Sequence, residues 1–489
     1  MEERKRLFVG GRWAAPGRDE HVAVISPHSE RPIARVAMAS ADDVDRAVAA
    51  ARLAFDEGPW PQLDPAERIA AVRRLAELYK PRRRDMAQLI TAEMGSPISF
   101  SKFSQATLPM MLLESFAAIA SAFPWEEVRP GFFGSDVLVR REPCGVVAAI
   151  VPWNLPLFLL VGKLAPALLA GCPVVIKPAP ETPLDALSFA ELVEEAGLPD
   201  GVVSILPGDA KVGEALVNHA GVDRVSFTGS TAVGRRIAAA CGASLKKATL
   251  ELGGKSAAIA LDDADPAAVA EGVKVAGLMN NGQACVAQTR VLVPAARRGE
   301  FVDALASMVE RLVVGDPADP ATEIGPLVSK RQQERVRSYI EGGRREGARL
   351  VAGGSELPAG VDRGWYVGPT LFADVDNRMT IAREEIFGPV LTVIPYRDEA
   401  DAIRIANDSD YGLSGSVWTA DGERGLAVAK RVRAGSFGVN GPYSMDPVAP
   451  FGGVKASGIG RELGREGLES YVDTKSVSGA RVAAKSSAE

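Results

Sequence analysis

A carboxylate and a thiol stand in two short segments whose residue types could do chemistry together. Residues 250–255 read Leu-Glu-Leu-Gly-Gly-Lys and place Glu251 ahead of two glycines, while residues 281–285 read Asn-Gly-Gln-Ala-Cys and end at Cys285. A thiolate can attack carbon and a carboxylate can activate water, which are the steps that form and hydrolyse a thioester. The chain has three histidines, and none lies in a segment that otherwise predicts catalysis: His21, His28 and His219. The sequence therefore favours a thiol and a carboxylate, with a Cys–His dyad as the alternative.

Each of these two residues also has a purely structural interpretation. A cysteine taken alone is more often a small buried side chain than a nucleophile. Residues 280–283, Asn-Asn-Gly-Gln, are poor core residues, so we expect the thiol of Cys285 in a polar, accessible loop. A glutamate is most often a surface residue, but Glu251 follows the strand-like residues 248–250. The carboxyl end of a buried strand is where α/β sheets bind their ligands.

Three further polar positions follow predicted strands. Asn154 lies in Pro-Trp-Asn-Leu-Pro, residues 152–156, where it could cap a turn or donate its side-chain amide to an oxyanion, and both interpretations are equally open. Lys177 ends an apolar strand and is either a surface charge or a ribose ligand. Gly229 and Ser230 lead into a predicted helix whose backbone amides suit a phosphate, although a plain glycine turn is the commoner explanation. The dinucleotide fingerprint GxGxxG is absent from this loop.

Alternating strands and helices must position these side chains. Between residues 145 and 250, apolar runs at 145–151, 173–176, 202–206 and 224–227 alternate with helical patterns at 157–170, 184–196 and 211–218. Repeated strand–helix–strand units predict a parallel, doubly wound sheet. A second alternating region, from 254 to about 440, carries Cys285 and predicts a second α/β domain. The first region of the chain reads as helical, with helix starts at Ser40 and at Asp64.

Composition limits the classes of protein to which the chain can belong. It has 489 residues, of which 47% are hydrophobic and 24% charged, which is typical of a globular protein with two or three domains. The net charge of −6 gives no nucleic-acid footprint, and the basic run at 80–84 is interpreted as a solvated helix end. The sequence predicts neither a membrane span nor a signal peptide, so we expect a soluble, cytoplasmic protein. None of the four cysteines forms a CxxC pair, and no metal site is predicted.

Taken together, these segments resemble the NAD(P)-dependent aldehyde dehydrogenase family. The resemblance extends in the family's order from about residue 7 to about residue 477. The motifs that carry it are Pro-Trp-Asn at 152–154, Ile-Lys-Pro at 176–178, Phe-Thr-Gly-Ser-Thr at 227–231, Glu-Leu-Gly-Gly-Lys at 251–255, Gly-Gln-Ala-Cys at 282–285, Glu-Glu-Ile-Phe-Gly-Pro-Val at 384–390 and Pro-Phe-Gly-Gly-Val-Lys-Ala-Ser-Gly at 450–458. Agreement at so many sites is not a chance match.

The resemblance implies a role for each candidate residue. Cys285 would attack the aldehyde, Asn154 and the Cys285 backbone N–H would hold the oxyanion, and Glu251 would activate the water that hydrolyses the thioester. Hydride would leave to a nicotinamide. The implied cofactor ligands are Lys177, Gly229, Ser230, Gly234, Glu385, Phe387, Trp153 and Gln332, and the implied substrate pocket includes Leu155 and Phe451. Pro180 stands where many NAD-preferring members carry glutamate, so NAD is favoured and NADP is the alternative.

The resemblance also implies an α/β fold of three parts. A doubly wound, Rossmann-like cofactor domain would comprise residues 1–124 and 143–252, and an α/β catalytic domain residues 253–440. A small β oligomerisation arm would comprise residues 125–142 and 467–489, with 441–466 as a return segment to the cofactor domain. Family members are usually homodimers or homotetramers, so we expect a homo-oligomer.

The substrate and the reaction class leave alternatives. Leu155 and Gly162 stand where some members carry aromatic residues, which predicts a roomier pocket for an apolar or a broad range of aldehydes. A CoA-acylating enzyme would pass the thioester to coenzyme A, but Glu251 argues for water as the acceptor. A non-catalytic structural or binding relative would not need Cys285, Glu251 and Asn154 together. A hydrolytic aldehyde dehydrogenase is therefore the leading prediction.

Overall fold

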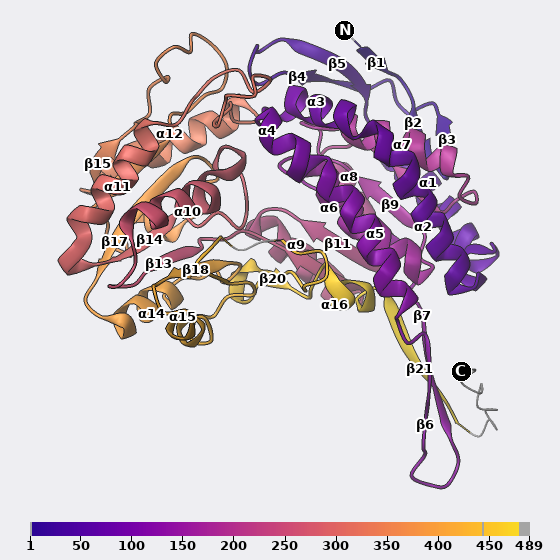
Figure 1. Cartoon of the computed structure of the whole chain (residues 1–489). Coiled ribbons are helices and arrows are strands. Elements are labelled where there is room, and N and C mark those ends of the chain that lie inside the picture. The colour runs from indigo at the N-terminus through magenta and orange to yellow at the C-terminus, as the bar shows by residue number, and fades with distance from the viewer. Residues whose placement is uncertain (1, 443–444, 479–489) are drawn as a thin grey trace.

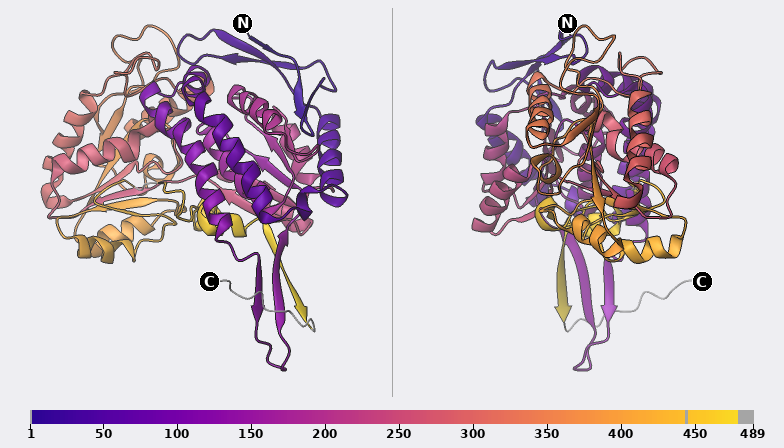
Figure 2. Two further views of the ribbon diagram at one scale, coloured as in Figure 1. Left: turned by 45° about the vertical axis from the view of Figure 1, so that its right-hand side comes forward. Right: turned by 90° about the vertical axis from the view of Figure 1, so that its left-hand side faces the viewer.

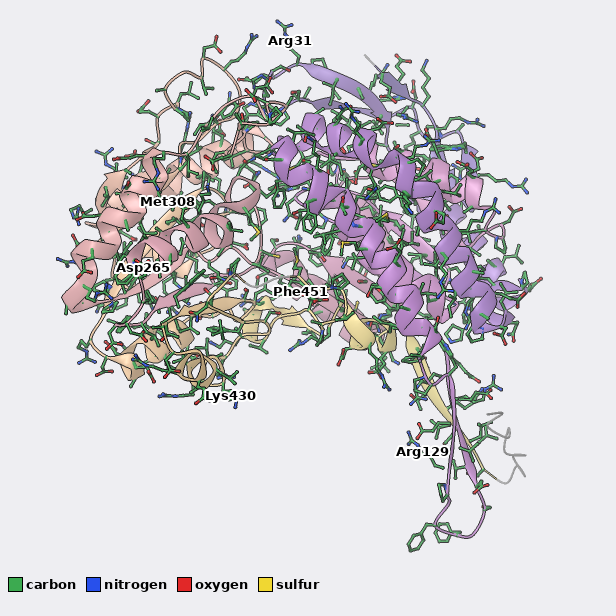
Figure 3. The ribbon with its side chains drawn as sticks, viewed as in Figure 1. Arg31, Arg129, Asp265, Met308, Lys430 and Phe451 are labelled. Atoms are coloured by element: carbon green, nitrogen blue, oxygen red, sulfur yellow. The ribbon has the colours of Figure 1, made fainter. Side chains whose placement is uncertain are left out.

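The molecule consists of two lobes that lie side by side and a narrow β arm that extends away from both (Figures 1 and 2). The structure is a computed structural model that describes residues 2–442 and 445–478. Met1, positions 443–444 of the predicted return segment and positions 479–489 of the predicted arm lie outside the described residues. Phe451 lies between the two lobes, and Arg129 lies on the arm (Figure 3).

The first lobe is built on an eight-stranded sheet in the order β20-β12-β11-β8-β9-β10-β2-β3. Its central strands run parallel: β8 (Val147–Ile150), β9 (Val174–Lys177), β10 (Val203–Ile205), β11 (Arg224–Thr228) and β12 (Lys247–Glu251). Short strands pair antiparallel at its edges: β2 (Leu7–Val9), β3 (Arg12–Ala14) and β20 (Gly458–Ile459). The predicted doubly wound sheet is confirmed, and the carboxyl ends of its parallel strands meet at one edge.

Helices cover both faces of this sheet, which is why its strands are apolar on both sides. One face packs against α6 (Pro156–Ala170) and α7 (Leu184–Ala196), with an outer layer of α2 (Pro65–Tyr79), α3 (Arg83–Met94) and α5 (Thr107–Ser121). The other face packs against α1 (Ala41–Asp56), α8 (Ala210–Asn218) and α9 (Thr231–Ala243). The helices therefore hold the sheet rigid while its carboxyl edge stays open to ligands.

The predicted helix starts are confirmed, but the first region of the chain is not wholly helical. The Asp43 carboxylate accepts from the Ser40 backbone N–H (2.8 Å) at the start of α1, and Glu67 accepts from the Asp64 backbone N–H (3.0 Å) at the start of α2. Before α1 the chain also forms a three-stranded sheet of β1 (Glu2–Arg4), β5 (Pro32–Ala37) and β4 (His21–Ile25). These strands are partly exposed and stand outside the alternation of strands and helices that predicts the equally short strands of the central sheet.

The second lobe is built on a seven-stranded sheet in the order β15-β16-β17-β14-β13-β18-β19. These strands are β13 (Ala257–Ala260), β14 (Arg290–Pro294), β15 (Arg349–Ala352), β16 (Thr370–Ala373), β17 (Val390–Tyr396), β18 (Gly415–Trp418) and β19 (Gly438–Val439). Only β15 pairs antiparallel within this sheet of described residues. Its helices are α10 (Pro266–Leu278), α11 (Arg298–Glu310), α12 (Lys330–Arg345), α13 (Thr380–Arg383), α14 (Glu399–Asn407) and α15 (Gly422–Ala429).

The arm is an antiparallel sheet in the order β21-β7-β6, made from segments far apart in the sequence. Its strands are β6 (Glu126–Arg129), β7 (Val137–Pro143) and β21 (Val472–Ser478), and β21 follows the short helix α16 (Gly464–Glu469). Phe132 and Phe133, between β6 and β7, are 97% and 96% exposed. Two adjacent exposed aromatic side chains are typical of a contact surface for another protein chain.

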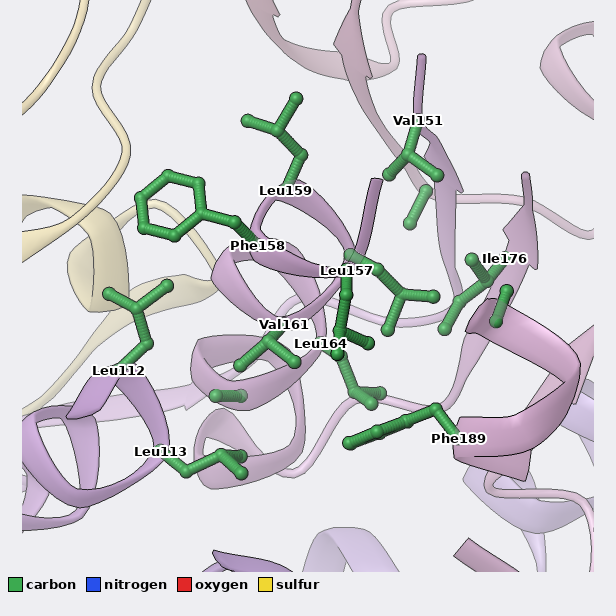
Figure 4. Close-up of a cluster of buried hydrophobic side chains, with 14 of the residues drawn as sticks. Leu112, Leu113, Val151, Leu157, Phe158, Leu159, Val161, Leu164, Ile176 and Phe189 are labelled. Atoms are coloured by element: carbon green, nitrogen blue, oxygen red, sulfur yellow. The ribbon is translucent and has the colours of Figure 1, made fainter. Parts of the chain in front are cut away.

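One helical stretch, Ile98–Ser121, is long and apolar enough to cross a membrane by length and composition, with a mean hydropathy of 1.2. It joins α4 (Ile98–Phe100), the π-helical η3 (Ser101–Gln105) and α5, and half of its most apolar window is buried inside the protein. α5 packs against α2 and α6, and Leu112 and Leu113 point into the same cluster as Val161 and Leu164 of α6 (Figure 4). This burial is typical of a core helix of a globular protein.

Two phenylalanines in this stretch test whether it contributes to the core. Phe116 is fully buried, whereas the Phe103 side chain is more than half exposed. We expect Phe116→Ala to lower the free energy of unfolding by about 3–5 kcal/mol, because it leaves a cavity, and Phe103→Ala by less than about 0.5 kcal/mol. Urea unfolding of both variants measures this difference. Equal midpoints would contradict the assignment of α5 to the core.

Candidate active site

A cavity of about 560 Å³ lies between the two lobes, at the carboxyl edge of the first sheet. Side chains that follow three parallel strands reach it: Trp153 and Asn154 follow β8, Gly229 and Ser230 follow β11, and Leu252 and Gly253 follow β12. Cys285 reaches the same cavity from the loop after α10 in the second lobe. The cavity thus combines residues of both lobes, where parallel sheets are expected to bind ligands.

The structure brings most of the predicted site residues to this one cavity. Those that line it are Trp153, Asn154, Gly229, Ser230, Cys285, Gln332, Glu385 and Phe387. Others lie nearby but not on its wall: Lys177 lines an adjoining cavity, Glu251 is buried, Leu155 and Phe451 belong to the hydrophobic core, and Gly234 packs against Leu252. The predicted cofactor contact of Gly234 therefore stays a prediction, and its observed role is close packing of α9.

The loop before Cys285 is held by buried side-chain amides. The Asn281 Nδ2 donates to the Gly95 carbonyl (3.0 Å) and the Pro326 carbonyl (2.9 Å), and its Oδ1 accepts from the Gly325 N–H (2.7 Å). The Gln283 Oε1 accepts from the Val328 N–H (3.1 Å). The expectation of an accessible polar loop is wrong, since residues 280–283 are buried. Polar side chains are needed there because an irregular buried backbone must find its hydrogen bonds in side chains.

This loop also needs an unusual backbone conformation. Asn280 and Asn281 have φ values of 53° and 61°, in the left-handed region that asparagine tolerates better than most residues. Gly282 follows with φ 71°, and a Cβ there would lie 2.2 Å from the Gly388 carbonyl oxygen. Only glycine fits this approach. The turn presents Cys285 to the cavity while its preceding residues stay in the protein interior.

The surroundings of Cys285 disfavour the thiolate. Burial, and then the negative charges of Glu385 and Glu251, raise the pKa of the Cys285 thiol above its ordinary value. None of the three histidines lines this cavity, so the described residues provide no Cys–His dyad there. The neutral thiol is therefore the resting form at neutral pH.

Asn154 has the geometry of an oriented amide donor. Its Nδ2 donates to the Gln283 carbonyl (3.0 Å), which leaves its second amide hydrogen without a partner among the described residues. Its backbone carbonyl accepts from the Gln105 Nε2 and the Asn280 Nδ2, both at 2.9 Å. Hydrogen bonds to distant residues therefore hold both the side-chain amide and the backbone carbonyl of Asn154 in place. This arrangement differs from a local turn cap, in which the side chain bonds to the neighbouring backbone.

Glu251 lies behind the cavity in a buried group of charges. Neither carboxylate oxygen has a well-aligned hydrogen-bond partner within the described part of the chain, although the Gly453 backbone N–H is near enough to lower the pKa of Glu251. A Cβ at Gly452 would lie 2.6 Å from the Glu251 Oε1. Burial, and then the charge of Glu462, raise the pKa of Glu251, while Lys163 and Arg461 act in the opposite direction. A carboxyl group with a raised pKa is suited to accept a proton near neutral pH.

A buried ion pair lies close enough to Glu251 to change its pKa, and the sequence analysis did not predict this pair. The Lys163 ammonium pairs with the Glu462 carboxylate and donates to the Thr228 hydroxyl (2.8 Å). The Ser226 hydroxyl donates to the same Glu462 oxygen (3.2 Å). Lys163 did carry a signal, because it is a single charge in the otherwise apolar α6. Glu462 carried none, since its partners come from distant parts of the sequence.

An adjoining cavity of about 320 Å³ lies between α8 and α9 and shares Gly229 with the first. Its apolar walls include Val217, Phe227, Val233 and Ile237, which fit a flat aromatic base such as adenine. Lys177 is not the surface charge that the sequence left open. Its Nζ is buried and donates to the Pro178 and Gly208 carbonyls, both at 2.9 Å, and burial lowers the pKa of Lys177 to about 8.

The larger cavity, which adjoins this one at Gly229, has features that suit the phosphate, ribose and nicotinamide parts of a dinucleotide. Ser230 caps α9, and the backbone amides of the first turn of this helix form a site that suits an anion such as a phosphate. The Glu385 Oε1 accepts from the Gly254 N–H (3.0 Å), and a Cβ at Gly253 would lie 2.6 Å from the other carboxylate oxygen. The Trp153 and Phe387 rings meet edge to face, with centroids 5.3 Å apart. The missing Cβ leaves room for the Glu385 carboxylate, which can accept hydrogen bonds from a sugar diol, and the two rings provide an aromatic wall that suits a nicotinamide.

Two arginines on the wall were missed by the sequence analysis. Arg331 and Arg335 line the cavity from α12, and the Arg335 Nη2 donates to the Glu385 backbone carbonyl (2.7 Å). Nothing in the charged, exposed helix from which they come distinguishes them from solvated surface residues.

Comparison with known proteins identifies the family. Residues 13–477 match the model of the aldehyde dehydrogenase family. The chain belongs to this family. Geranial dehydrogenase of Castellaniella defragrans is 48% identical over 475 residues, covering 97% of this chain and 98% of that protein. Betaine aldehyde dehydrogenase of Brucella canis is 42% identical over 473 residues and 96% of each chain.

Solved structures of the family have the same fold. The Mycobacterium tuberculosis aldehyde dehydrogenase complexed with NAD+ superposes with a TM-score of 0.95 at 50% identity, covering 97% of this chain and 98% of that one. A mutant of Pseudomonas syringae aldehyde dehydrogenase C complexed with NAD+ and octanal gives a TM-score of 0.94 at 42% identity, covering 97% and 96%. The predicted aldehyde dehydrogenase fold is confirmed.

The raised pKa of the Cys285 thiol predicts a pH-dependent reactivity. Without cofactor, its rate of alkylation by iodoacetamide should rise about tenfold per pH unit between pH 7 and pH 9, because the thiolate fraction rises in that proportion below the pKa. Peptide mass spectrometry at each pH measures the rate. The peptides that carry the other cysteines serve as internal controls, and a plateau of the Cys285 rate below pH 8 would contradict the assignment.

Proposed function

We propose that this aldehyde dehydrogenase is a hydrolytic enzyme that oxidises an aldehyde, with NAD as the acceptor, to a carboxylic acid. In the overall reaction the aldehyde, NAD+ and water give the acid, NADH and a proton. The observation that carries the proposal is the placing of Cys285 and Asn154 on one cavity wall, with Glu251 buried behind it. The dinucleotide-shaped cavity, and the NAD+ present in the solved relatives, support NAD as the cofactor.

The first covalent step belongs to Cys285. Its sulfur bonds to the aldehyde carbon as the carbonyl electrons move to oxygen, and the thiol proton passes to solvent, from which the Cys285 thiolate recovers a proton when the carbon–sulfur bond breaks in the second step. The free amide hydrogen of Asn154 and the Cys285 backbone N–H hold the oxygen where negative charge develops. NAD, when bound, supplies the acceptor for the hydride of this carbon. The acyl group then remains on Cys285 as a thioester.

The second step belongs to Glu251 and the charges around it. Its carboxylate takes a proton from water, the water oxygen attacks the thioester carbon, and the carbon–sulfur bond breaks to release the acid. A buried carboxyl group must lose that proton again before the next cycle. The Lys163–Glu462 pair lies beside it, and its two charges act on the proton affinity of Glu251 in opposite directions. We propose that this pair sets the pKa of Glu251 for repeated turnover.

An apolar aldehyde fits the surroundings of Cys285 best. Leu155 and Phe451 are apolar and buried in the core that also contacts Cys285. A Cβ at Gly162 would lie at van der Waals distance from Leu112 (3.8 Å) and Leu463 (3.9 Å), so the surroundings of this glycine are apolar and leave room for a small group. Octanal in the Pseudomonas syringae complex, and the name of the Castellaniella defragrans relative, support a hydrophobic aldehyde.

The wider organisation follows the same proposal. We assign residues 1–124 and 143–252 to a cofactor domain, 253–440 to a catalytic domain, 441–466 to a return segment, and 125–142 with 467–489 to an oligomerisation arm. The exposed Phe132 and Phe133 support a homo-oligomer. The four free cysteines support a reducing compartment such as the cytoplasm. A small-molecule aldehyde is the proposed partner, without nucleic acid, membrane or metal.

Reduction of NAD and of NADP with a panel of aldehydes tests the proposed function directly. We expect an increase in reduced-nicotinamide absorbance with apolar aldehydes and NAD, with the free acid as product and no requirement for coenzyme A. The NAD to NADP ratio of kcat/KM tests the cofactor preference that Pro180 leaves open. A requirement for coenzyme A would favour the acylating alternative. Cofactor binding without turnover of any aldehyde would favour the non-catalytic alternative.

Two substitutions separate the two covalent steps. Cys285→Ala should lower turnover by more than about 10⁴-fold, because no thioester can form, and should leave cofactor binding intact. Glu251→Gln should give one stoichiometric burst of reduced cofactor and then stall, because the thioester forms but is not hydrolysed. Stopped-flow absorbance measures both. Cys241→Ala, at a buried thiol in α9, is the control, and steady turnover by Glu251→Gln would remove this residue from its role.

A further inference from the structure

A third, much smaller cavity lies in the second lobe, beside the segment that joins β12 to β13. Lys255 and Ser256 line it just before β13, and Ser414 lines it just before β18. Arg290 and Arg433 complete its charged wall. The aldehyde and cofactor chemistry proposed above uses none of these side chains, so the cavity needs a separate explanation.

Three of the polar side chains that line this cavity are buried and end in an atom without a hydrogen-bond partner among the described residues. The Lys255 Nζ, the Ser256 Oγ and the Ser414 Oγ have no hydrogen-bond partner among the described residues. Lys255 is 2% exposed and the two serines are each 4% exposed. An unpartnered buried ammonium group costs several kcal/mol, and polar groups in native interiors are almost always satisfied. Three orphaned groups in one cavity therefore indicate a ligand that they bind together.

The charges on the cavity wall indicate whether the ligand is a cation or an anion. No carboxylate lines the cavity among the described residues, whereas three basic side chains do. Arg290 is itself fully buried, but it donates only to neutral acceptors, namely the Lys255, Ile405 and Ala406 carbonyls and the Asn377 side chain. Its charge is therefore not neutralised by a direct contact. A site of donors and positive charge binds an anion.

Neighbouring charges both raise and lower the pKa of Lys255. Burial, and then the charge of Arg290, lower the pKa of Lys255 to about 7, while Glu385 and Glu384 act in the opposite direction from outside the cavity wall. A bound anion would stabilise the protonated form and would remove the electrostatic conflict with Arg290.

The size of the cavity decides the chemical class. Its volume is about 10 Å³, which corresponds to about one water-sized sphere. Polyatomic anions such as phosphate, sulfate and carboxylates are therefore too large, whereas a single monatomic anion in the place of one water requires only a slight outward movement of the flexible Lys255 and serine side chains. We propose that this cavity is a halide site, in which the Lys255 ammonium and the hydroxyls of Ser256 and Ser414 hold one chloride ion. The site lies close to the catalytic loop, because a Cβ at the adjacent Gly254 would lie 2.3 Å from the Cys285 carbonyl oxygen.

Bromide scattering tests the proposal without any variant. Crystals of the full chain soaked in sodium bromide, with data collected at the bromine edge, should show an anomalous peak within hydrogen-bond distance of the Lys255 Nζ. The same peak should appear in crystals that contain NAD, because the site does not depend on the cofactor. Bromide peaks elsewhere but none at Lys255 would overturn the proposal and would assign the cavity to a water molecule.

A matched pair of lysine variants tests the site in solution. Thermal midpoints in sodium bromide and sodium gluconate, at equal ionic strength, should differ saturably for the parent protein, by about 1 °C at tenfold the Kd for a chain of this size. Lys255→Met should abolish this difference and the anomalous peak. Lys455→Met is the control, because the Lys455 Nζ already donates to the Asn407 and Ser409 carbonyls and should not affect either measurement. A bromide effect that persists in Lys255→Met would overturn the proposal.

Discussion

The structure depends on one constraint, which is that an irregular, left-handed turn must be buried between two lobes. The turn at residues 280–283 brings Cys285 to the carboxyl edge of a sheet to which it does not belong. Its backbone forms only a short 3₁₀ turn, closed by the Gln283 N–H and the Asn280 carbonyl (3.0 Å). The side chains of Asn281 and Gln283 therefore tie the turn to distant backbone carbonyl and amide groups. The same amides tie α3, the turn and the segment before α12 together, so the thiol position depends on the contact between the lobes.

Several charged side chains near this turn are also buried. Glu251, Lys163 and Glu462 on one side, and Lys255 with Arg290 on the other, are all nearly inaccessible to water. A protein keeps such groups only where partners or ligands offset the loss of hydration. Lys163 and Glu462 satisfy each other, whereas Glu251 and Lys255 lack well-aligned hydrogen-bond partners among the described residues. Glu251 lies next to the active-site cavity, where the proposed hydrolysis needs a proton acceptor. Lys255 lines a cavity that suits a small anion.

Much of the fold could be predicted because its signals are local. Strand–helix alternation between residues 145 and 250 predicts the parallel sheet, and the acids after Ser40 and Asp64 predict the starts of α1 and α2. The strands before α1 could not be predicted, because they are partly exposed and no helices alternate with them. The polarity of residues 280–283 led to the wrong expectation of an accessible loop, because a sequence does not reveal whether polar side chains face water or a buried backbone.

The sequence by itself determined the residue types of the chemistry: a thiol, a carboxylate and an amide, each at the end of a predicted strand or loop. It also determined the parallel sheet whose carboxyl edge collects two of them. Only the tertiary structure decided that Cys285 meets Asn154 on one cavity wall, that Glu251 lies behind it with Lys163 and Glu462, and that Lys255 is buried without a partner. The physical reason is that burial and the distances between charges depend on contacts between segments far apart in the chain, which no local pattern records.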